Sequence, residues 1–155
     1  MSNEINDSHA KWMIERYPFL TIKDNSVHPW LKIDSTEYHW LSDIPAGWVN
    51  SFGIEMCDEL LKVLDKYVDD FIIVQTKEKY GSFVVYYYWS DIYHTNEELE
   101  EISRIDKEVR YILDKYKHLS YHTCVICGRV ATKYSSPWIL PFCDNCFENL
   151  DKHFG

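Results

Sequence analysis

The sequence predicts an α+β fold: a small antiparallel sheet packed by two main helices, followed by a C-terminal module built around four cysteines. Three observations support this prediction. Residues 71–90 have the composition of a β-hairpin, residues 51–68 and 95–118 have helical periodicity, and two CxxC pairs lie near the C-terminus. The chain of 155 residues is expected to divide into an α+β domain, residues 1–120, and the four-cysteine module, residues 121–155, packed on it.

The first 70 residues predict two helices separated by irregular structure. A short amphipathic helix is expected at 8–17, because Pro18 disfavours the helical conformation of the residue before it. Residues 20–40 are expected to be irregular or to form short strands. A longer helix is predicted at 51–68, where apolar residues recur on one face: Ile54, Cys57, Leu61, Leu64 and Val68. Cys57 is expected to be a buried apolar residue rather than a catalytic thiol, since its neighbours are acidic.

Residues 71–90 are predicted to form a β-hairpin. Both arms are rich in β-branched and aromatic residues, and Tyr80 and Gly81 are expected to form the turn. With that turn, the better core face carries Ile72, Val74, Val85, Tyr87 and Trp89. The opposite face carries Ile73, Gln75, Tyr86 and Tyr88. On that opposite face, Tyr86 and Tyr88 would either pack on a helix or form a tyrosine-rich binding surface.

Residues 95–118 give the clearest helical pattern. Thr95 and Glu98 match a capping box at its start. Acidic residues cluster near the first turn and basic residues near the last, which complements the helix dipole. The buried face is predicted to carry Leu99, Ile102, Val109, Ile112, Leu113 and Tyr116. The charge of this helix is therefore explained by helix stability.

The most specific signal is the two CxxC motifs, which are separated by 15 residues and contain Cys124, Cys127, Cys143 and Cys146. Two such motifs at this spacing are typical of one tetrahedral zinc site with four thiolate ligands. Gly128 follows the first motif directly, where the turn needs a residue that tolerates positive φ. Four thiolates leave no open position for water, so the predicted Zn2+ is structural. The module is expected to be a treble clef, with a zinc ribbon as the alternative.

The acidic residues are unevenly distributed. The net charge is −9, and residues 34–70 contain nine acidic residues against Lys62 and Lys66, a balance of −7. A solvated helix face would explain such a segment; the alternative is a surface that steers a basic protein partner. The residues predicted to contact the partner are Asp58, Glu59, Asp65, Asp69, Asp70, Tyr86 and Tyr88.

Several functional classes are disfavoured. The chain has no glycine-rich phosphate loop and no His-Glu-x-x-His or Gly-x-Ser-x-Gly motif, so no catalytic residue is predicted and an enzyme is not expected. It has no apolar run long enough for a membrane span, and its first ten residues lack a signal-peptide core, so a cytoplasmic protein is expected. The negative charge disfavours nonspecific binding to nucleic acid.

The order of these features resembles a group of small, largely uncharacterised bacterial and phage proteins. In that group a helix with Gly-Trp and Leu-Cys precedes a hairpin of the type Val-Lys-Glu-Lys-Phe-Gly-Gly-Leu-Arg-Phe-Tyr, and a second helix and a CxxC…CxxC tail follow. The matching stretches here are Gly47-Trp48, Met56-Cys57, 75–86, 123–128 and 142–146. Ser82 and Val84 replace the second glycine and the arginine of that hairpin. The resemblance implies a microbial, cytosolic protein and no particular activity.

Together these features predict a non-enzymatic, zinc-containing protein that binds and inhibits another protein. The expected partner is a basic toxin or effector, for an immunity protein, or a host defence protein, for a phage inhibitor. A nucleic-acid-associated regulator that uses Arg129 and Lys133 of the zinc module is the alternative from another class. A small enzyme is the third, and would need a cleft that unites Cys57 or the helix carboxylates with a histidine.

Overall fold

The computed structural model describes residues 2–90 and 94–150, with side chains from residue 9 onward. Its elements, in chain order, are helix α1 (Ser2–Arg16), the 3-10 turn η1 (Pro18–Leu20), helix α2 (Ala46–Trp48), the π-helical turn η2 (Val49–Gly53), helix α3 (Ile54–Leu64), the 3-10 segment η3 (Asp65–Asp70), strands β1 (Phe71–Lys79) and β2 (Ser82–Trp89), helix α4 (Asn96–Tyr121), strands β3 (Lys133–Tyr134) and β4 (Pro141–Phe142), and helix α5 (Asp144–Glu148). The predicted α+β class is confirmed.

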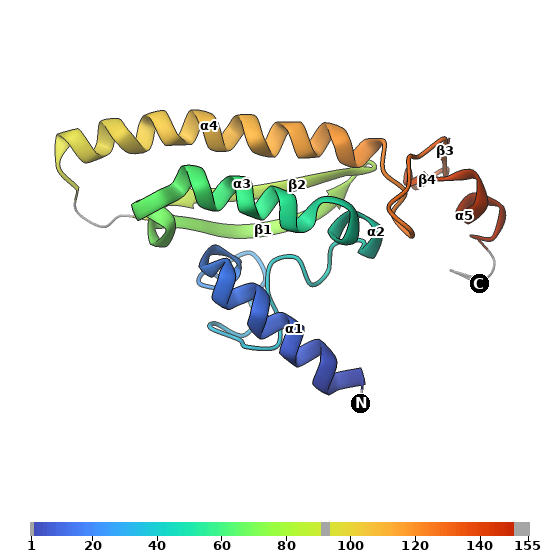
Figure 1. The fold of residues 1–155 in the computed structure, drawn as a ribbon, viewed down its shortest axis with the longest axis horizontal. Coiled ribbons are helices and arrows are strands. Elements are labelled where there is room, and N and C mark those ends of the chain that lie inside the picture. The colour runs from blue at the N-terminus through green and yellow to red at the C-terminus, as the bar shows by residue number, and fades with distance from the viewer. Residues whose placement is uncertain (1, 91–93, 151–155) are drawn as a thin grey trace.

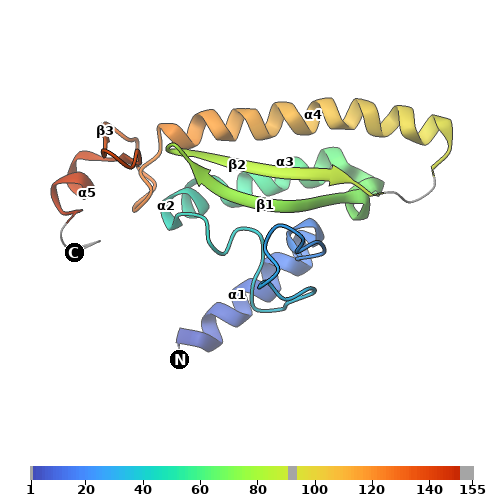
Figure 2. The same ribbon diagram turned by 180° about the vertical axis from the view of Figure 1, so that it is seen from behind.

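The body, residues 2–90 and 94–120, is a β-hairpin with two helices on one face. Helices α3 and α4 cover the same side of the β1–β2 sheet (Figure 1), and the opposite side is seen in front of the helices in Figure 2. Rings from each layer meet in the core: Phe52 stacks on Tyr116 of α4 at 5.5 Å between centroids and lies 6.3 Å from Phe83 of β2. This packing buries Phe83 and Tyr116 almost completely.

The predicted hairpin turn is confirmed. Tyr80 and Gly81 have φ angles of 52° and 84°, and they separate the paired residues Lys79 and Ser82. Two left-handed residues at these positions are typical of the type I′ turns that match the twist of the strands. The hydrogen bond from Gly81 N to Glu78 Oε2, 2.7 Å, also fixes this turn.

The predicted faces of β1 need a correction. The pairing register shifts between Ile73 and Gln75, which is a β-bulge at Val74. Ile73 pairs with Tyr87, and Ile72 pairs with Tyr88. Because directly paired residues share a face, Ile73 lies on the core face and Ile72 on the opposite one, the reverse of the prediction. The predicted faces of β2 agree with the register.

Two predicted helices have different ends in the structure. Helix α3 stops at Leu64 instead of continuing to Val68, because Asp65 has φ 47° and cannot extend the helix. Helix α4 begins with the predicted capping box, in which Thr95 and Glu98 exchange hydrogen bonds, and it runs three residues beyond the predicted end at 118. The N-terminal helix also begins earlier than predicted, at Ser2.

The cysteine module, residues 121–150, lies beyond the C-terminal end of α4 (Figure 1). It contains the short hairpin β3–β4, in which Lys133 pairs with Phe142, and the single-turn helix α5. Strands of two residues and a helix of five cannot be stable by themselves. The module therefore depends on its cysteine cluster and on its contacts with the body.

Candidate functional site

The four predicted ligands lie on two different local structures. Cys124 and Cys127 flank a tight turn closed by the hydrogen bond from Gly128 N to Cys124 O, 3.0 Å, and Gly128 has φ 81° as the motif requires. Cys143 is the N-cap of α5, and Cys146 lies in its first turn. The β3–β4 hairpin connects the two pairs. Because the second pair lies at a helix start, the arrangement is that of a treble clef rather than a zinc ribbon.

The four sulfur atoms form one cluster in which all lie within 4.8 Å of one another. Cys127 Sγ and Cys143 Sγ are 3.6 Å apart. The backbone N–H of Cys146 donates to Cys143 Sγ at 3.4 Å. Cys124, Cys143 and Cys146 are buried, and Cys127 is exposed. This cluster could hold one metal ion, with every coordination position of a tetrahedron occupied by sulfur.

The ionisation of the cluster also favours a cation. Burial raises the pKa of the Cys124 thiol, but hydrogen bonds from surrounding backbone N–H groups outweigh this effect and lower the pKa to about 7. The pKa of Cys146 is instead raised, by burial and by the neighbouring cysteines. One thiolate therefore forms readily, and it opposes the ionisation of the others. A bound cation removes that opposition and allows all four thiolates to form.

A backbone clamp fastens the cysteine module to the body. We define the clamp as Gly47 and Trp48 against residues 123–125. Gly47 N donates to Val125 O at 2.8 Å, and Trp48 Nε1 donates to Thr123 O at 2.9 Å. A side chain at position 47 would collide with the backbone of Cys124, so only glycine allows this approach. Sequence patterns alone do not reveal the clamp, because Trp48 and Thr123 lie 75 positions apart.

Two of the acids predicted to contact a partner, Asp58 and Glu59, form hydrogen bonds and ion pairs within the molecule. Asp58 Oδ1 accepts a hydrogen bond from Tyr17 at 2.6 Å and lies 3.4 Å from Arg16 Nη2. Glu59 binds Lys115 Nζ at 2.6 Å and accepts a hydrogen bond from the hydroxyl of Tyr116. Tyr116 and Lys115 belong to α4, so Glu59 links α3 to α4. The contacts of Asp58 and Glu59 described here are therefore with residues of the body.

Asp70 is buried, whereas Asp65 and Asp69 lie on the surface. Asp70 is 8% exposed, and its Oδ1 accepts a hydrogen bond from Ser90 Oγ at 2.9 Å and lies 3.1 Å from His94 Nε2. Asp69 lies 3.6 Å from Lys23 Nζ. Asp70 thus ties η3 to the connection between β2 and α4.

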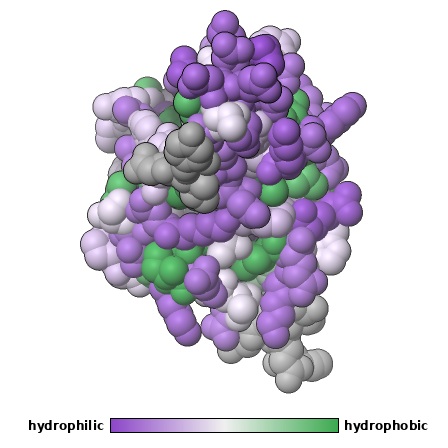
Figure 3. Space-filling view, turned by 90° about the vertical axis from the view of Figure 1, so that its left-hand side faces the viewer, coloured by the Kyte–Doolittle hydropathy of each residue, from purple (hydrophilic) through white to green (hydrophobic). Residues whose placement is uncertain are grey.

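The exposed acids form what we call the acidic end: Asp65, Asp69, Glu97 and Glu100. Segment η3 lies against the first turns of α4, because Tyr67 donates a hydrogen bond to Glu101 at 2.7 Å. Figure 3 views this end of the molecule, which is largely covered by hydrophilic residues. Asp65 and Asp69 of η3 and the exposed acids at the start of α4, whose charge the sequence explains by helix stability alone, therefore lie at the same end.

Tyr86 and Tyr88 lie on the sheet face that α3 and α4 do not cover. They are 38% and 42% exposed, and the hydroxyl of Tyr88 donates to Asp24 Oδ2 at 2.8 Å. The two expected alternatives were that these tyrosines pack on a helix or form a binding surface. The register places them on the face away from α3 and α4. They could therefore contribute to a binding surface.

Cys57 does not have the surroundings of a catalytic thiol. Its side chain is fully buried in the apolar core. Burial, together with the neighbouring Asp58, raises the pKa of its thiol far above the ordinary range. A thiol that remains protonated and inaccessible is not a nucleophile. The reading of the chain as a cysteine enzyme therefore gains no support from this residue.

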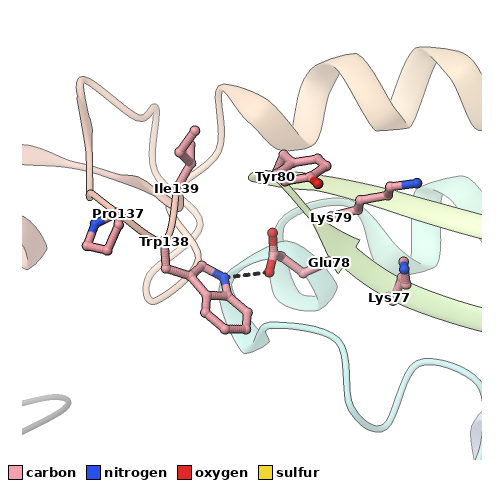
Figure 4. Close-up of a pocket in the computed structure, with 7 residues that line it drawn as sticks. All are labelled: Lys77, Glu78, Lys79, Tyr80, Pro137, Trp138 and Ile139. Atoms are coloured by element: carbon pink, nitrogen blue, oxygen red, sulfur yellow. Dashed lines mark hydrogen bonds between the residues drawn. The ribbon is translucent and has the colours of Figure 1, made fainter.

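A groove that the sequence analysis missed lies between the hairpin turn and the cysteine module. We call it the tip groove; it has a volume of about 540 Å³ and is lined by Lys77, Glu78, Lys79, Tyr80, Pro137, Trp138 and Ile139. Figure 4 shows the indole of Trp138 directed at Glu78, and Trp138 Nε1 donates to Glu78 Oε1 at 2.9 Å. Trp138 is nevertheless 71% exposed, and Tyr80 is 76% exposed.

Comparison with family models, curated proteins and solved structures found no match to this chain. None of the helices in the described parts of the chain has an apolar stretch sufficient to span a bilayer.

Proposed function

We propose that this chain is a non-catalytic protein-binding protein whose binding surface is shaped by a structural zinc ion. The observation that carries the proposal is the arrangement of four cysteine sulfurs within 4.8 Å of one another, in a module clamped to the body beside the tip groove. The metal stabilises the chain segment that forms one wall of that groove. The role of the metal is to shape a surface, and it provides no open coordination site.

Zinc is the metal that best fits the cluster. Zinc–sulfur bonds of about 2.3 Å in a tetrahedron place the sulfurs about 3.8 Å apart, close to the 3.6 Å between Cys127 and Cys143. Four thiolates also select zinc over magnesium or calcium, which prefer oxygen ligands. The hydrogen bond from Cys146 N to Cys143 Sγ orients this ligand, as outer interactions do in metal sites.

A protein partner fits the exposed surfaces better than a small substrate. The tip groove carries two large aromatic side chains, Trp138 and Tyr80, that are mostly exposed. Aromatic residues of this kind are typical anchors of protein interfaces. The acidic end can attract a partner with a basic face at long range. Within this class we favour an inhibitor that acts in the cytoplasm, either an immunity protein for a toxin or effector or a phage inhibitor of a host defence protein.

The first experiment is capture of partners with tagged protein from a lysate of the cells that produce it. The captured material is analysed by mass spectrometry and by absorbance at 260 nm, and the zinc content of the bait is measured. We expect one zinc ion per chain and one stoichiometric protein partner. Recovery of nucleic acid in place of a protein, or turnover of a small molecule by the bait, would contradict the proposal.

A charge-reversal pair tests the contribution of the acidic end. The double variant Asp65→Lys, Asp69→Lys should slow association with the captured partner and weaken the dependence of its rate on salt. The matched control is Glu55→Lys, Glu108→Lys, which makes the same change in net charge at exposed positions outside the acidic end. Equal effects of the two double variants would show that the acidic end is only a solvated surface.

A further inference from the structure

The tip groove has a charge opposite to that of the whole chain. The net charge is −9, yet the groove contains Lys77 and Lys79, which form no ion pair within the described parts of the chain. Its one carboxylate, Glu78, is already engaged by Trp138 Nε1 and Gly81 N. Both donors are neutral, so Glu78 keeps its negative charge, and the three charged side chains of the groove sum to +1.

An adjoining hollow extends this basic surface. It has a volume of about 290 Å³ and shares Lys79 and Tyr80 with the tip groove, and its other walls include Tyr86 and Lys117. No carboxylate lines it among the described residues. The two hollows form a continuous surface around the hairpin turn, with three lysines and exposed aromatic rings.

The strand that forms the groove also offers backbone groups to an extended ligand. Lys79 and Ser82 flank the two-residue turn, so they form the hydrogen-bonded pair that closes the hairpin. Hydrogen-bonded and non-hydrogen-bonded pairs alternate along an antiparallel ladder. Glu78, the next residue of β1, therefore directs its N–H and C=O away from β2, toward the outer edge of the sheet. Such an edge can pair with a strand from another protein.

One hydrogen bond favours an orientation of Trp138 that suits such a ligand. Its indole N–H is bound by Glu78, and the turn residue Gly81 lies close to the backbone of Ile139. A fixed aromatic ring binds with a smaller loss of conformational entropy than a mobile one. The cysteine cluster supports the segment that carries this ring, which connects the groove to the metal.

We propose that the tip groove binds an extended acidic segment of the partner protein, which pairs with the outer edge of β1 near Glu78. Its carboxylates contact Lys77, Lys79 and Lys117, and an apolar side chain packs on Trp138. This inference rests on the proposed protein-binding function and names the chemistry of the bound segment. A short acidic peptide fits better than a nucleic acid, because three lysines neutralise few phosphates and a chain of charge −9 repels a long polyanion.

Selection from a library of random peptides of about twelve residues tests the inference. The wild-type protein should enrich peptides that contain several Asp or Glu residues and an aromatic residue. The variant Lys77→Glu, Lys79→Glu should lose this enrichment. In fluorescence anisotropy it should bind the selected peptides at least about tenfold more weakly than the wild type. The variant Trp138→Ala should also weaken binding.

The matched control is Lys62→Glu, Lys107→Glu, which makes the same charge change at exposed helix positions outside the groove and should leave binding unchanged. Each variant is first shown to hold zinc and to have the circular dichroism of the wild type. Equal losses in both double variants, enrichment of basic peptides or no enrichment would overturn the proposal. If a single-stranded thymidine oligonucleotide binds more tightly than any selected peptide, the proposal is also overturned, and the ligand of the groove is a nucleic acid.

The captured partner separates this inference from the proposed function. If the variant Lys77→Glu, Lys79→Glu still captures the same partner at full yield, the groove proposal is wrong and the protein-binding function stands. If the wild type captures no protein at all, the proposed function is wrong, whatever the peptides do.

Discussion

The body and the cysteine module are stabilised in different ways. The body supplies most of a continuous apolar cluster that includes Trp48, Phe71, Phe83 and Tyr116, and the module adds Val125, Phe142 and three of its cysteines. The module's own elements are two-residue strands and one five-residue helix. Burial is distributed over many contacts, so the loss of one contact weakens the body by a limited amount. Metal ligation is concentrated in four atoms, so the loss of one ligand should unfold the module. The predictions below test this difference.

The largest effect is expected from Cys143→Ser. Apparent binding free energies of structural zinc are on the order of 10–16 kcal/mol, and removal of a ligand forfeits much of that energy. The variant should lose its zinc, measured by elemental mass spectrometry, and residues 121–150 should lose protection from amide hydrogen exchange. Cys57→Ala is the control, because it also removes a cysteine, but from the apolar core. It should keep the metal and lose only about 1–2 kcal/mol of stability.

A substitution in the clamp should loosen the module from the body without replacing a cysteine. In Gly47→Ala the new methyl group would collide with the backbone of Cys124. Because backbone atoms must move, the loss of folding free energy should exceed the cost of ordinary overpacking, about 1–3 kcal/mol. The affinity for zinc should fall at least about tenfold. Competition with a chromophoric chelator measures this change.

Gly53→Ala is the control in the same helical region. Its added methyl group would lie 3.3 Å from Val49 Cγ1, a side-chain contact that can relax. Unchanged zinc affinity in both variants would mean that the clamp does not connect the body to the metal.

The body should lose stability in acid through His39. Burial, with a smaller effect from His9, lowers the pKa of His39 from 6.5 to about 4, and its Nδ1 accepts a hydrogen bond from Leu41 N at 3.1 Å. The folded state therefore keeps this histidine neutral, while the unfolded chain takes up a proton below pH about 6.5. Above that pH, His39 does not lower the free energy of unfolding. Between pH 6.5 and 4, proton uptake by the unfolded chain lowers that free energy by up to about 3 kcal/mol.

His39→Asn should remove this part of the pH dependence, because an amide oxygen can accept the same hydrogen bond without titrating. Denaturant unfolding of the body between pH 7 and 4 measures the slope. His118→Asn provides the matched control, because it makes the same replacement at a histidine whose side chain is 76% exposed. A slope that His39→Asn leaves unaltered would assign the acid sensitivity to other groups.

The smallest effect is expected from Trp48→Phe. The phenyl ring keeps most of the apolar burial but leaves the buried carbonyl of Thr123 without its indole donor. An unpaired buried acceptor costs about 1–3 kcal/mol. Trp138→Phe also loses an indole hydrogen bond, to Glu78, at an exposed position. Trp138→Phe should lower the free energy of unfolding by less than about 0.5 kcal/mol. If Trp48→Phe and Trp138→Phe lower it equally, the hydrogen bond of Trp48 does not stabilise the clamp.

Local patterns predicted the elements that depend on neighbouring residues. The capping box of α4, the Tyr80-Gly81 turn and the four clustered cysteines all follow from residues close together in the sequence. The face assignment of β1 failed at Val74, because a bulge is an insertion in the pairing of two strands and leaves the alternation within one strand unchanged. The end of α3 depended on one residue with positive φ, Asp65, which periodicity does not detect.

The long-range features could not be predicted in the same way. Charge counts treated Asp58, Glu59 and Asp70 as free to contact a partner, but each is bound by a side chain at least 20 positions away. The tip groove joins Glu78 to Trp138 across 60 positions. Neither partner in such a contact has a local signature. Their recognition needs the fold, which places the module beside the hairpin turn.

The clamp also has a consequence for synthesis of the chain on the ribosome. Trp48 and the carbonyl that binds it are 75 positions apart, so the tryptophan leaves the ribosome long before its acceptor is made. During that interval Trp48 lacks its acceptor, and the core lacks the module residues Val125 and Phe142 that pack in the same cluster. A nascent chain would therefore need protection by chaperones until residues 123–146 emerge and bind metal. If the cluster holds zinc as proposed, the cellular zinc supply would then influence the yield of folded protein as well as its stability.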